Sequence, residues 1–477
     1  MVFDLLITNA TVVTMNENGE VLEDGAVGIR DGQIVSVGPT DAVGSAGDAD
    51  RHIDGTDHIV LPGLINAHVH VPDILSRGYG KGRILHDWIT NAKRPFVANM
   101  DPEDHRLAAA VYCAEAISSG ITTFVENAGG TGIGYSDEII DAKMDVYERA
   151  GLRNIYAHGF VTKESNEEFD ALIASLKRKD PGIDHADSAM TTPEDALARV
   201  KTLLERYHGT AEGRQTVWPA PYLANLVCGE TLRGAYSLAE EYDVMTTTHT
   251  AESELQERSP LSSVEYLHAE GYLGERTLLG HCVQVDAHDI QLLSKTGTKV
   301  SHNMAANLEL ASGIAPVPEM HTAGITLGLG TDNACLSDLV NLFADLRLVS
   351  LVHKGYTRNP TAISPRDVLA MATSEGARAI GRSELGTIEA ETAADLLLID
   401  ATHHNLTPIN DIYSALVHQM QGNEVETVIC DGTIIMEDRT IPALETAFPN
   451  LHSKATEATA RIAEESGLEP TQTDSGR

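Results

Sequence analysis

The sequence predicts an α/β fold in which a (β/α)8 TIM barrel carries a small β-sandwich built from both chain ends. Apolar, strand-like segments alternate with amphipathic helical stretches through the middle of the chain, which is typical of parallel βαβ units. Short segments in which apolar and polar residues alternate occupy both ends. The 477 residues, 42% of them hydrophobic, suffice for a large core and a smaller one beside it.

The two chain ends are expected to share one domain. The N-terminal end contains LLITNATVVT, AVGIRDGQIVSVG and HIVLP, and the C-terminal end contains ADLLLIDAT and VETVICDGTIIMED. Gly and Asp mark the turns between these runs. We therefore predict the sandwich at residues 1–61 and 380–447, the inserted barrel at 62–379, and a polar tail at 448–477. Within the tail, we expect EATARIAEESG to be helical and TQTDSGR to be disordered.

Eight segments of the middle region are predicted as barrel strands. Amphipathic stretches such as PEDHRLAAAVYCAEAISSG and TPEDALARVKTLLERYHG lie between them. A doubly wound open sheet is the alternative, and it would carry a glycine-rich phosphate-binding turn after its first strand. GTGIG is the only candidate for that turn, and it lacks the helix-opening context. The eight segments are GLINAHVH, TTFVENA, NIYAHGF, TVWPAPY, VMTTTHTAE, TLLGHCV, KVSHNM and TLGLGTDN.

The charge balance restricts the partners of the protein. Acidic residues number 70 against 34 basic ones, which gives a formal net charge of −36. This charge repels nucleic acid and anionic membranes, so we expect neither as a partner. The acidity is spread along the chain, which fits a solvated surface and, more specifically, halophilic adaptation to high salt.

Cysteine usage and hydropathy suggest a cytoplasmic protein that acts on a small molecule. The N-terminal stretch lacks the pattern of a signal peptide, and no apolar run reaches the roughly 20 residues that span a bilayer. The five cysteines form no CxxC motif, so we expect reduced thiols and a cytoplasmic location. We also expect a homo-oligomer.

The strongest chemical signal is the HxH pair formed by His68 and His70. Residues two apart on a strand point to the same face, so both imidazoles can bind one ion at the mouth of the barrel. The pair follows the apolar run LPGLINA, which marks the end of a strand. A lone HxH motif is weak, because surface or core histidines often have this spacing, but its position here favours a metal site.

Two further strand ends complete a ligand set. His249 follows the β-branched run MTTT in the fifth segment, and Asp332 follows the apolar run LGLGT in the eighth. The carboxyl ends of barrel strands face the active site, so these side chains would join His68 and His70. Three imidazoles and one carboxylate suit a single divalent ion, Zn²⁺ with Fe²⁺ as the alternative.

The same region supplies candidates for proton transfer. Glu252 lies three residues after His249, which places its carboxylate near the metal without making it a necessary ligand. We expect Glu252 to move protons, Asp332 to take one from the attacking water, and His281 to polarise the substrate. A helix N-terminal acid is the alternative for Glu252, and a buried structural histidine the alternative for His281.

Other strand ends carry weaker candidates. His158 ends the third segment, His302 the seventh, and Glu126 lies near the end of the second. We expect them to line the substrate pocket, with a purely structural role as the alternative for His302. A non-enzymatic scaffold is the rival function class. It would have no reason to retain a metal site, and all four proposed ligands are present.

These motifs together resemble the amidohydrolase superfamily, in particular its branch of heterocycle deaminases and triazine hydrolases. PGLINAHVH is similar to the PGL-(V/I)-N-x-H-x-H signature of that branch, and HTAE to its HxxE motif. LLGHCV, SHNMAANLELASGIAPV and LGLGTDNA resemble its later motifs, in the same order. The resemblance covers nearly the whole chain. It implies the same four metal ligands, the same roles for Glu252 and His281, and a pocket lined by Trp88.

Two departures from the nucleoside deaminases of this branch bear on the substrate. Those proteins carry a ribose-binding acid two residues after the proline that Pro95 matches, and Val97 stands there in this chain. They also carry an arginine where this chain has His158. Both differences weaken a nucleoside substrate and favour a free base, a substituted triazine or a pyrimidine. The fourth segment, TVWPAPY, has no lysine that could bridge two ions, which argues for one metal.

We therefore expect a metal-dependent hydrolase whose activated water attacks an electron-poor ring carbon of an N-heterocycle. Deamination, with release of ammonia or an amine, is the first prediction. Hydrolytic dechlorination, as in triazine chlorohydrolases, is the alternative, and so is deamination of a nucleoside such as S-adenosylhomocysteine or methylthioadenosine. The catalytic residues would serve all of these reactions.

Overall fold

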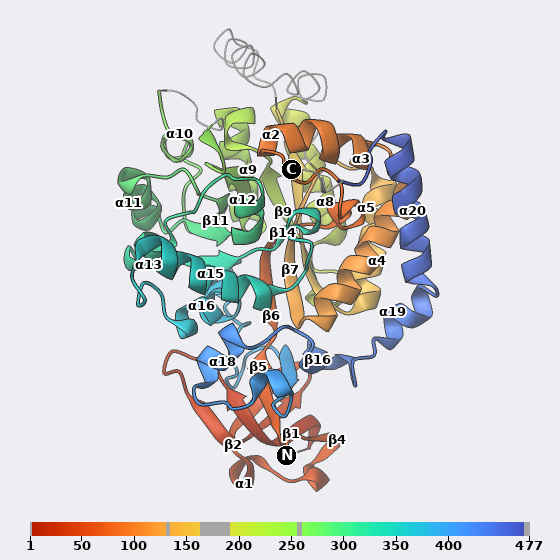
Figure 1. Ribbon diagram of the computed structural model, residues 1–477, viewed down its shortest axis with the longest axis vertical. Helices are drawn as coiled ribbons and strands as arrows, with labels where there is room; N and C mark the ends of the chain where they lie inside the picture. The colour runs from red at the N-terminus through yellow and green to blue at the C-terminus, as the bar shows by residue number, and fades with distance from the viewer. Residues whose placement is uncertain (1, 130–133, 163–190, 255–259, 472–477) are drawn as a thin grey trace, which may run out of the picture.

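The computed structural model describes residues 2–129, 134–162, 191–254 and 260–471. Two parallel sheets form the centre of the molecule, and a third sheet lies at the end that holds the N-terminus (Figure 1). The motif GTGIG, apart from its last glycine, and the segment TQTDSGR, apart from its first residue, lie outside the described residues.

The two central sheets contain the predicted strands. One sheet has the order β14-β6-β7-β8-β9 and the other β10-β11-β12-β13, and every pairing within them is parallel. Each predicted segment holds a strand, and the eighth holds two, so the prediction of a parallel α/β fold is confirmed. The strands are β6 (Leu64–His70), β7 (Ile121–Ala128), β8 (Arg153–Phe160), β9 (Gln215–Pro221), β10 (Thr246–Thr250), β11 (Thr277–His281), β12 (Lys299–His302), β13 (Leu327–Leu329) and β14 (Asp332–Asn333).

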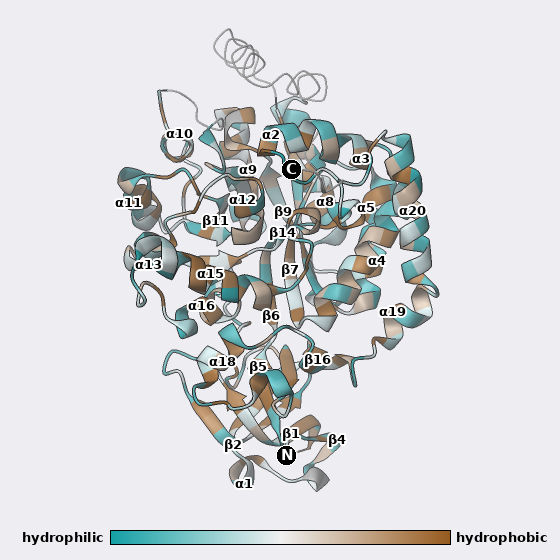
Figure 2. Ribbon diagram, viewed as in Figure 1, coloured by the Kyte–Doolittle hydropathy of each residue, from teal (hydrophilic) through white to brown (hydrophobic). Residues whose placement is uncertain are grey.

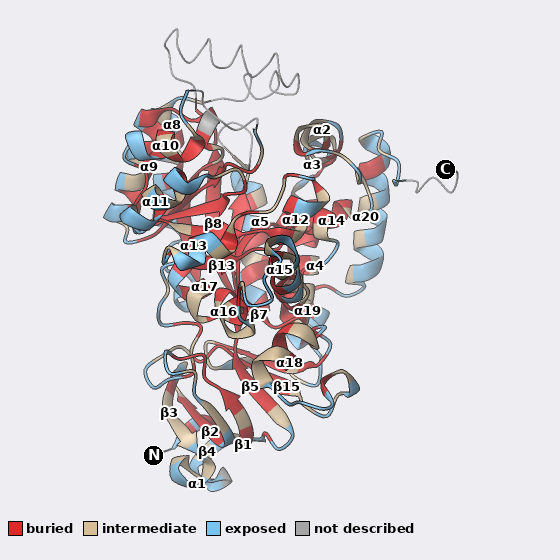
Figure 3. Ribbon diagram, turned by 60° about the vertical axis from the view of Figure 1, so that its left-hand side comes forward, coloured by how far each residue is buried: buried red, intermediate tan, exposed pale blue. Residues whose placement is uncertain are grey.

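Helices cover the outer faces of these sheets. The strands β6 to β9 are buried along their whole length, whereas the helices expose their outer sides (Figure 3). Burial on both faces explains why these strands are nearly continuous apolar runs. The covering helices include α4 (Pro102–Ser118), α5 (Asp137–Ala150), α8 (Pro193–Tyr207), α9 (Gly229–Glu241), α10 (Ser263–Ala269), α11 (Ala287–Thr296), α13 (Val317–Thr322), α15 (Leu342–Thr357), α16 (Pro365–Met371) and α17 (Ser374–Ala379).

Acidic and hydroxyl side chains fix where many of these helices begin. The carboxylate of Asp101 caps α4 by accepting a hydrogen bond from the backbone N–H of Asp104, and the carboxylate of Asp104 accepts one from the backbone N–H of Asp101. Thr192 caps α8 in a similar way. Such caps satisfy otherwise unpaired N–H groups, and the negative charge is favourable at the N-terminus of a helix. Some of the many acidic residues therefore stabilise the N-terminal ends of helices.

The two parallel sheets approach each other at both edges. On one side, the backbone N–H of His249 in β10 donates to the carbonyl of Tyr222, just beyond β9 (3.3 Å), and Leu223 forms a bridge with His249. On the other side, β14 follows β13 after two residues and pairs with β6, where Asp332 lies opposite Val69. Because all the strands run the same way, their carboxyl ends lie at one end of the sheets.

Both chain ends contribute to the third sheet. Its eight strands have the order β17-β16-β15-β5-β1-β2-β3, with β4 beside β1, and β15 runs antiparallel to β5 with Leu398 opposite Val60. Its strands are largely hydrophobic (Figure 2). They are β1 (Phe3–Val13), β2 (Val21–Arg30), β3 (Gln33–Pro39), β4 (Ala49–Asp54), β5 (His58–Pro62), β15 (Leu396–Asp400), β16 (Val425–Cys430) and β17 (Thr433–Met436).

The C-terminal region returns to the central part of the molecule. Helix α20 (Leu451–Glu465) contains most of the segment predicted to be helical, and it packs against α4. Arg461 pairs with Asp104 (2.6 Å), and the hydroxyl of Thr459 donates to the carbonyl of Leu75 (3.0 Å). Within the described residues, no helix combines the length and the apolar character needed to cross a membrane.

Short helices surround the carboxyl ends of the central strands. The 3-10 helix η2 (Val71–Ser76) follows β6 directly. A longer helical segment lies at the end of the molecule away from the third sheet (Figure 1). It is composed of α2 (Leu85–Trp88), the π-helix η3 (Ile89–Lys93) and α3 (Arg94–Ala98). Helices α12 (Met304–Glu309) and α14 (Ala334–Ser337) follow β12 and β14.

Candidate metal centre and active site

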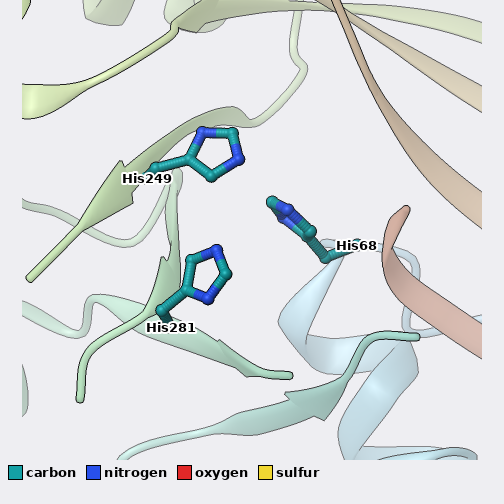
Figure 4. A group of neighbouring side chains, drawn as sticks. All are labelled: His68, His249 and His281. Carbon is teal, nitrogen blue, oxygen red and sulfur yellow. The ribbon is translucent and has the colours of Figure 1, made fainter. Parts of the chain in front are cut away.

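The four predicted metal ligands lie together at the carboxyl ends of β6, β10 and the start of β14. The Nε2 atoms of His70 and His249 are 3.1 Å apart. Asp332 Oδ1 lies 3.6 Å from His68 Nε2 and 3.4 Å from His70 Nε2. The rings of His68 and His249 face a common point together with that of His281 (Figure 4). Donor atoms from four separate segments thus surround one small volume.

Hydrogen bonds at Nδ1 orient the Nε2 atoms of two of these rings toward each other. Nδ1 of His70 lies 2.7 Å from the carbonyl oxygen of Asn127, and Nδ1 of His249 lies 2.7 Å from that of Tyr222. A carbonyl oxygen can only accept, so each Nδ1 carries the proton and each Nε2 presents a lone pair. This arrangement is the usual way in which proteins hold metal-binding histidines.

Burial keeps these imidazoles neutral, as metal binding requires. All four side chains are 5% exposed or less. Burial lowers the pKa of His70 and of His249 well below the ordinary value, and nearby cationic groups lower it further. Burial alone would raise the pKa of Asp332, but the neighbouring His68, His281 and His70 lower it overall. The carboxylate therefore remains ionised.

The donor set fits a divalent metal ion. His68 Nε2 is fully buried and has no hydrogen-bond partner, a costly state for a polar atom that a coordinated cation relieves. Imidazole nitrogens combined with one carboxylate oxygen are ligands that Zn²⁺ and other divalent transition metals accept. The residues present are thus suited to one such ion.

Glu252 and His281 lie beside this centre. His281 Nε2 is 3.8 Å from Glu252 Oε2, and donor atoms of both residues and of Asp332 all lie within 4.8 Å of one another. Nδ1 of His281 is 2.9 Å from Oδ1 of Asn307, which fixes the ring with Nε2 toward Glu252. A carboxyl, an imidazole and a second carboxylate at these distances can exchange protons with a molecule bound between them.

Backbone conformation at the centre is unusual. His281 has φ of 73° and Asp332 has φ of 54°, a left-handed region that residues other than glycine rarely adopt. Such strain persists only where surrounding contacts hold it, and it concentrates at functional sites. His281 is the last residue of β11, and Asp332 is the first residue of β14.

The predicted substrate-binding residues occupy different surroundings. Trp88, in α2, is 2% exposed and packs in an apolar cluster between the α2 segment and helices α12 and α14. His158, at the end of β8, is fully buried next to Tyr156. Their contact with a substrate stays a prediction.

His302 ends β12, but its ring lies 5.4 Å from the ring of His353 in α15. The residue before it, Ser301, pairs with Gly280, where an added Cβ would lie 3.2 Å from the ring of His68. Alternate strand residues face opposite sides, so Ser301 faces the metal ligands and His302 faces the helix layer. A contact between His302 and the substrate likewise stays a prediction.

Glu126 also faces away from the metal ligands. Its carboxylate pairs with Lys143 of α5 and accepts a hydrogen bond from the hydroxyl of Tyr147 (2.7 Å). Asn127, the next residue in β7, points the other way, and its side-chain amide lies 2.9 Å from Nδ1 of His68. The structure therefore places a structural ion pair where the sequence suggested a pocket residue.

Sequence reasoning missed four residues near the centre. Lys93 of η3 lies 3.0 Å from Asp73 of η2 and donates to Asn333 (3.1 Å), which follows Asp332. The ring of Tyr222 lies 4.7 Å from that of His249. The spacing HVHVPD offered a signal for Asp73, because it follows the HxH pair on the same segment. Lys93 carried no comparable signal in the sequence.

Comparison with known proteins identifies the family. The sequence model of the amidohydrolase family matches residues 59–435. The chain belongs to this family. The resemblance inferred from the motifs is therefore confirmed, and the matched range includes all the candidate site residues.

Curated relatives of this amidohydrolase include deaminases and a triazine hydrolase. The chain is 33% identical to a 5'-deoxyadenosine deaminase of Methanosarcina barkeri over 447 residues, 93% of this chain and 95% of the relative. It is 31% identical to a 5-methylthioadenosine/S-adenosylhomocysteine deaminase of Pelotomaculum thermopropionicum, with 93% and 95% covered. An S-triazine hydrolase of Gordonia rubripertincta is 36% identical over 68% of each chain.

Solved structures show the same fold. A zinc-bound adenosine deaminase from Xanthomonas campestris superposes with a TM-score of 0.84 at 25% identity, covering 97% of this chain and 99% of that one. A mutant of atrazine chlorohydrolase from Arthrobacter aurescens, complexed with zinc and atraton, gives 0.84 at 25% identity, with 96% and 100% covered. These likenesses bear out the prediction of a hydrolase that acts on carbon–nitrogen bonds and uses a divalent metal.

Proposed function

We propose that this amidohydrolase binds one Zn²⁺ through His68, His70, His249 and Asp332 and removes an amino group from an N-heterocycle by hydrolysis. The observation that carries the proposal is the convergence of these four side chains with the proton-handling pair Glu252–His281, whose nearest atoms are 3.8 Å apart. Fe²⁺ is the alternative ion, because it accepts the same ligands.

The chemistry divides between the ion and three side chains. When bound, a divalent ion supplies a nucleophile at neutral pH, because it lowers the pKa of water from about 16 toward 7. Asp332, held ionised by the surrounding histidines, accepts a proton. Glu252 delivers a proton to the ring nitrogen of the substrate, which turns the amino-bearing carbon into an electrophile. His281, whose Nε2 faces Glu252, helps to orient the adduct and to stabilise the oxygen that adds to that carbon.

Hydrolytic dechlorination is the second candidate function. An S-triazine hydrolase is among the relatives, and an atrazine chlorohydrolase shares the fold. Attack at a ring carbon, protonation of the ring and loss of the substituent need the same three side chains whether ammonia, an amine or chloride leaves. Deamination remains the first proposal, because relatives with deaminase names match more than nine-tenths of the chain.

We further propose that Trp88, His158 and His302 lie within reach of the substrate when it is bound, and that the substrate is a base with a small or apolar substituent. Val97 cannot accept the hydrogen bonds of ribose hydroxyls. Two of the relatives are named for nucleosides, so deamination of 5'-deoxyadenosine, methylthioadenosine or S-adenosylhomocysteine is the specific alternative.

The architecture proposed around this site is a closed (β/α)8 barrel at residues 62–379. The contacts of β9 with β10 and of β14 with β6 support closure. We also propose that the sheet of residues 1–61 and 380–447 folds into a two-layered sandwich, with 448–477 as an appended segment. A buried apolar cluster drawn from β1, β2, β5, β15 and β16 supports that sandwich.

A homo-oligomeric state and a cytoplasmic location stay predictions, and the five cysteines, all buried and unpaired, fit the latter.

Release of ammonia from a panel of heterocycles tests the proposal. Zinc-loaded protein would be incubated with aminopurines, aminopyrimidines and aminotriazines, beside chlorotriazines assayed for chloride. We expect ammonia from at least one aminated ring, none after removal of the metal, and release about 10²- to 10⁴-fold slower from a Glu252→Gln variant. Chloride release without ammonia would replace deamination by dechlorination, and neither product from any ring would overturn the proposed function.

A further inference from the structure

Lys93 is a largely buried cation that joins the helical segment of α2, η3 and α3 to β14, the strand that contains Asp332. Its ammonium lies 3.0 Å from Asp73 of η2 and 3.1 Å from Oδ1 of Asn333 in β14, and its side chain is only 14% exposed. Burial alone would lower the pKa of Lys93, but the negative charges of Asp73 and its neighbours raise it overall. The side chain therefore remains a cation, which can donate hydrogen bonds but cannot accept them.

The local backbone explains how Lys93 reaches this position. It is the last residue of the π-helix η3, and Pro95 follows two residues later in α3. Proline has no N–H to donate to the carbonyl four residues earlier, and its ring crowds that carbonyl, so the helix widens before it. Single π-turns of this kind are frequent at functional sites.

The orientation of the Asn333 amide follows from its two neighbours. Lys93 can only donate, so the oxygen of the amide must face it. The nitrogen then faces the ionised carboxylate of Asp332 and donates to Oδ1 at 2.9 Å. A reversed amide would place two donors face to face on one side and two acceptors on the other. The ammonium of Lys93 thus ensures that Asn333 presents its nitrogen, and not its oxygen, to the carboxylate of Asp332.

We propose that Lys93 is a positioning residue for the reaction, acting through Asn333 to fix the carboxylate of Asp332. The Oδ1 atom that Asn333 holds is the one nearest the two histidines of the HxH pair, at 3.6 and 3.4 Å. Asp332 also has left-handed backbone geometry, so an external hydrogen bond restrains a side chain whose own backbone is strained. The inference rests on the proposed function, because it assigns Asp332 the role of ligand and proton acceptor.

The same lysine connects this carboxylate to the segment that carries Trp88. The ammonium lies 5.3 Å from the centre of the Trp88 ring, and both residues belong to the same helical segment. Movement of that segment would therefore shift the carboxylate of Asp332, because Lys93 and Asn333 connect the two. Lys93 does not touch the reacting atoms in this scheme, and its effect belongs to kcat rather than to substrate binding.

Lys93→Met removes the donor and keeps the length of the side chain. We expect kcat to fall by about ten- to a hundredfold, since small misplacements of catalytic groups have effects of this size, while KM changes less than about threefold. Lys93→Arg should recover most of the rate, because guanidinium also donates to both partners. Asn333→Ala should resemble Lys93→Met, and the double variant should be no slower than the slower single one.

Lys81 provides a matched control in the loop before α2. Its ammonium donates to the carbonyl of Leu336 (2.6 Å) and pairs with Asp338 just after α14 (2.8 Å) and with Glu309 (3.9 Å). None of these partners contacts Asp332 among the described interactions. Lys81→Met should therefore leave kcat unchanged. Lys93→Met also leaves Asp73 buried without a counter-ion, so the variant Asp73→Asn/Lys93→Met is measured beside it to remove that charge.

A readout that needs no substrate separates this inference from the proposed function. Co²⁺ would replace the metal, and its visible d–d bands respond to the position of a carboxylate ligand. We expect altered bands in Lys93→Met and in Asp73→Asn/Lys93→Met. We expect wild-type bands in Lys81→Met and Lys93→Arg. Wild-type bands in all variants would overturn the inference, even if the enzyme proved to act on another substrate. A rise in KM with unchanged kcat would also overturn it, because Lys93 would then bind substrate directly.

Discussion

The Nε2 atoms of His70 and His249 lie 3.1 Å apart, although 179 residues separate them along the chain. Each ring donates through Nδ1 to a backbone carbonyl, so in the neutral state both Nε2 atoms present lone pairs to each other. Two facing lone pairs at this distance repel, and a cation shared between them removes the repulsion. The two Nε2 atoms are therefore arranged to share a metal ion.

Removal of a ligand should remove the ion. His70→Ala deletes one imidazole nitrogen, and we expect metal affinity to fall at least as much as the roughly 10–100-fold that loss of an outer hydrogen-bond partner causes. Activity should disappear with the metal. Metal content by elemental analysis and melting temperature check this result. His288→Ala, at an exposed position, is the control and should retain both metal and activity. Full metal content in His70→Ala would mean that the ion binds elsewhere.

Replacement of Glu252 should separate metal binding from proton transfer. Glu252→Gln keeps the shape of the side chain but cannot exchange a proton, so we expect kcat to fall about 10²- to 10⁴-fold with one metal ion still bound per chain. Steady-state kinetics and metal analysis on the same preparation measure both quantities. Loss of the ion from this variant would instead make Glu252 a ligand.

The convergence of the four candidate metal ligands could be predicted because it follows from strand geometry. An HxH pair at the end of a buried strand must point both rings to one face, and parallel strands bring their carboxyl ends together. Three segments far apart in the sequence therefore converge on one centre without any knowledge of loops. The central strands could also be predicted, because strands that are buried on both faces have continuous apolar runs in the sequence.

The surroundings of the ligands could not be predicted in the same way. His302 ends a strand as His281 does, yet it faces the helix layer, because side-chain direction depends on register and on local left-handed turns such as the one at His281. Lys93 reaches Asn333 from a helical segment 240 residues away in the chain, and no periodicity encodes that contact. The pairing of Glu126 with Lys143 likewise depends on how α5 packs.

Asp345 should make stability depend on pH. Burial in α15 raises the pKa of this carboxyl to about 7, compared with 3.8 for an exposed one. The unfolded chain thus releases this proton from about pH 4, while the folded protein retains it until about pH 7. The contribution of Asp345 to the free energy of unfolding therefore decreases by at most about 4 kcal/mol between pH 4 and pH 7. Above pH 7 it changes no further.

The substitution Asp345→Asn removes this titration and keeps the shape of the side chain. We expect the variant to be more stable than the wild type at pH 8, and this advantage to shrink as the pH falls to 5. Urea unfolding at several pH values measures the difference. Asp50→Asn, at an exposed position of β4, serves as the control for loss of one negative charge. Equal pH profiles for Asp345→Asn and wild type would show that Asp345 does not titrate in this range.

The acidic composition should make the protein more stable in concentrated salt. A formal charge of −36 on one chain produces self-repulsion, and ions at molar concentration shorten the screening length to about 3 Å. We expect the melting temperature to rise steadily between low-salt buffer and molar KCl. Sucrose at equal osmolality is the control, because it stabilises by exclusion without screening charge. A melting temperature that is the same in both salt conditions would rule out halophilic adaptation.

The last prediction concerns the size of the substrate. Val97, in α3, is partly buried and packs against the main core, and its side chain cannot accept a hydrogen bond. A ribose hydroxyl buried without a partner costs roughly 1–3 kcal/mol, which corresponds to about five- to 150-fold in affinity. We therefore expect kcat/KM to be higher for a base with a small or apolar substituent than for the matching nucleoside.

Val97→Glu tests the reason for this preference. A carboxylate at this position can accept hydrogen bonds from the ribose hydroxyls, so we expect kcat/KM for the nucleoside to rise relative to that for the base. Ala98→Glu adds the same charge at the neighbouring exposed position of α3 and should leave the ratio unchanged. Both variants would be assayed with adenine, adenosine, 5'-deoxyadenosine and methylthioadenosine under one metal and salt condition. A wild-type preference for any of these nucleosides over the base would contradict the prediction, and would mean that a residue other than the one at position 97 recognises the sugar.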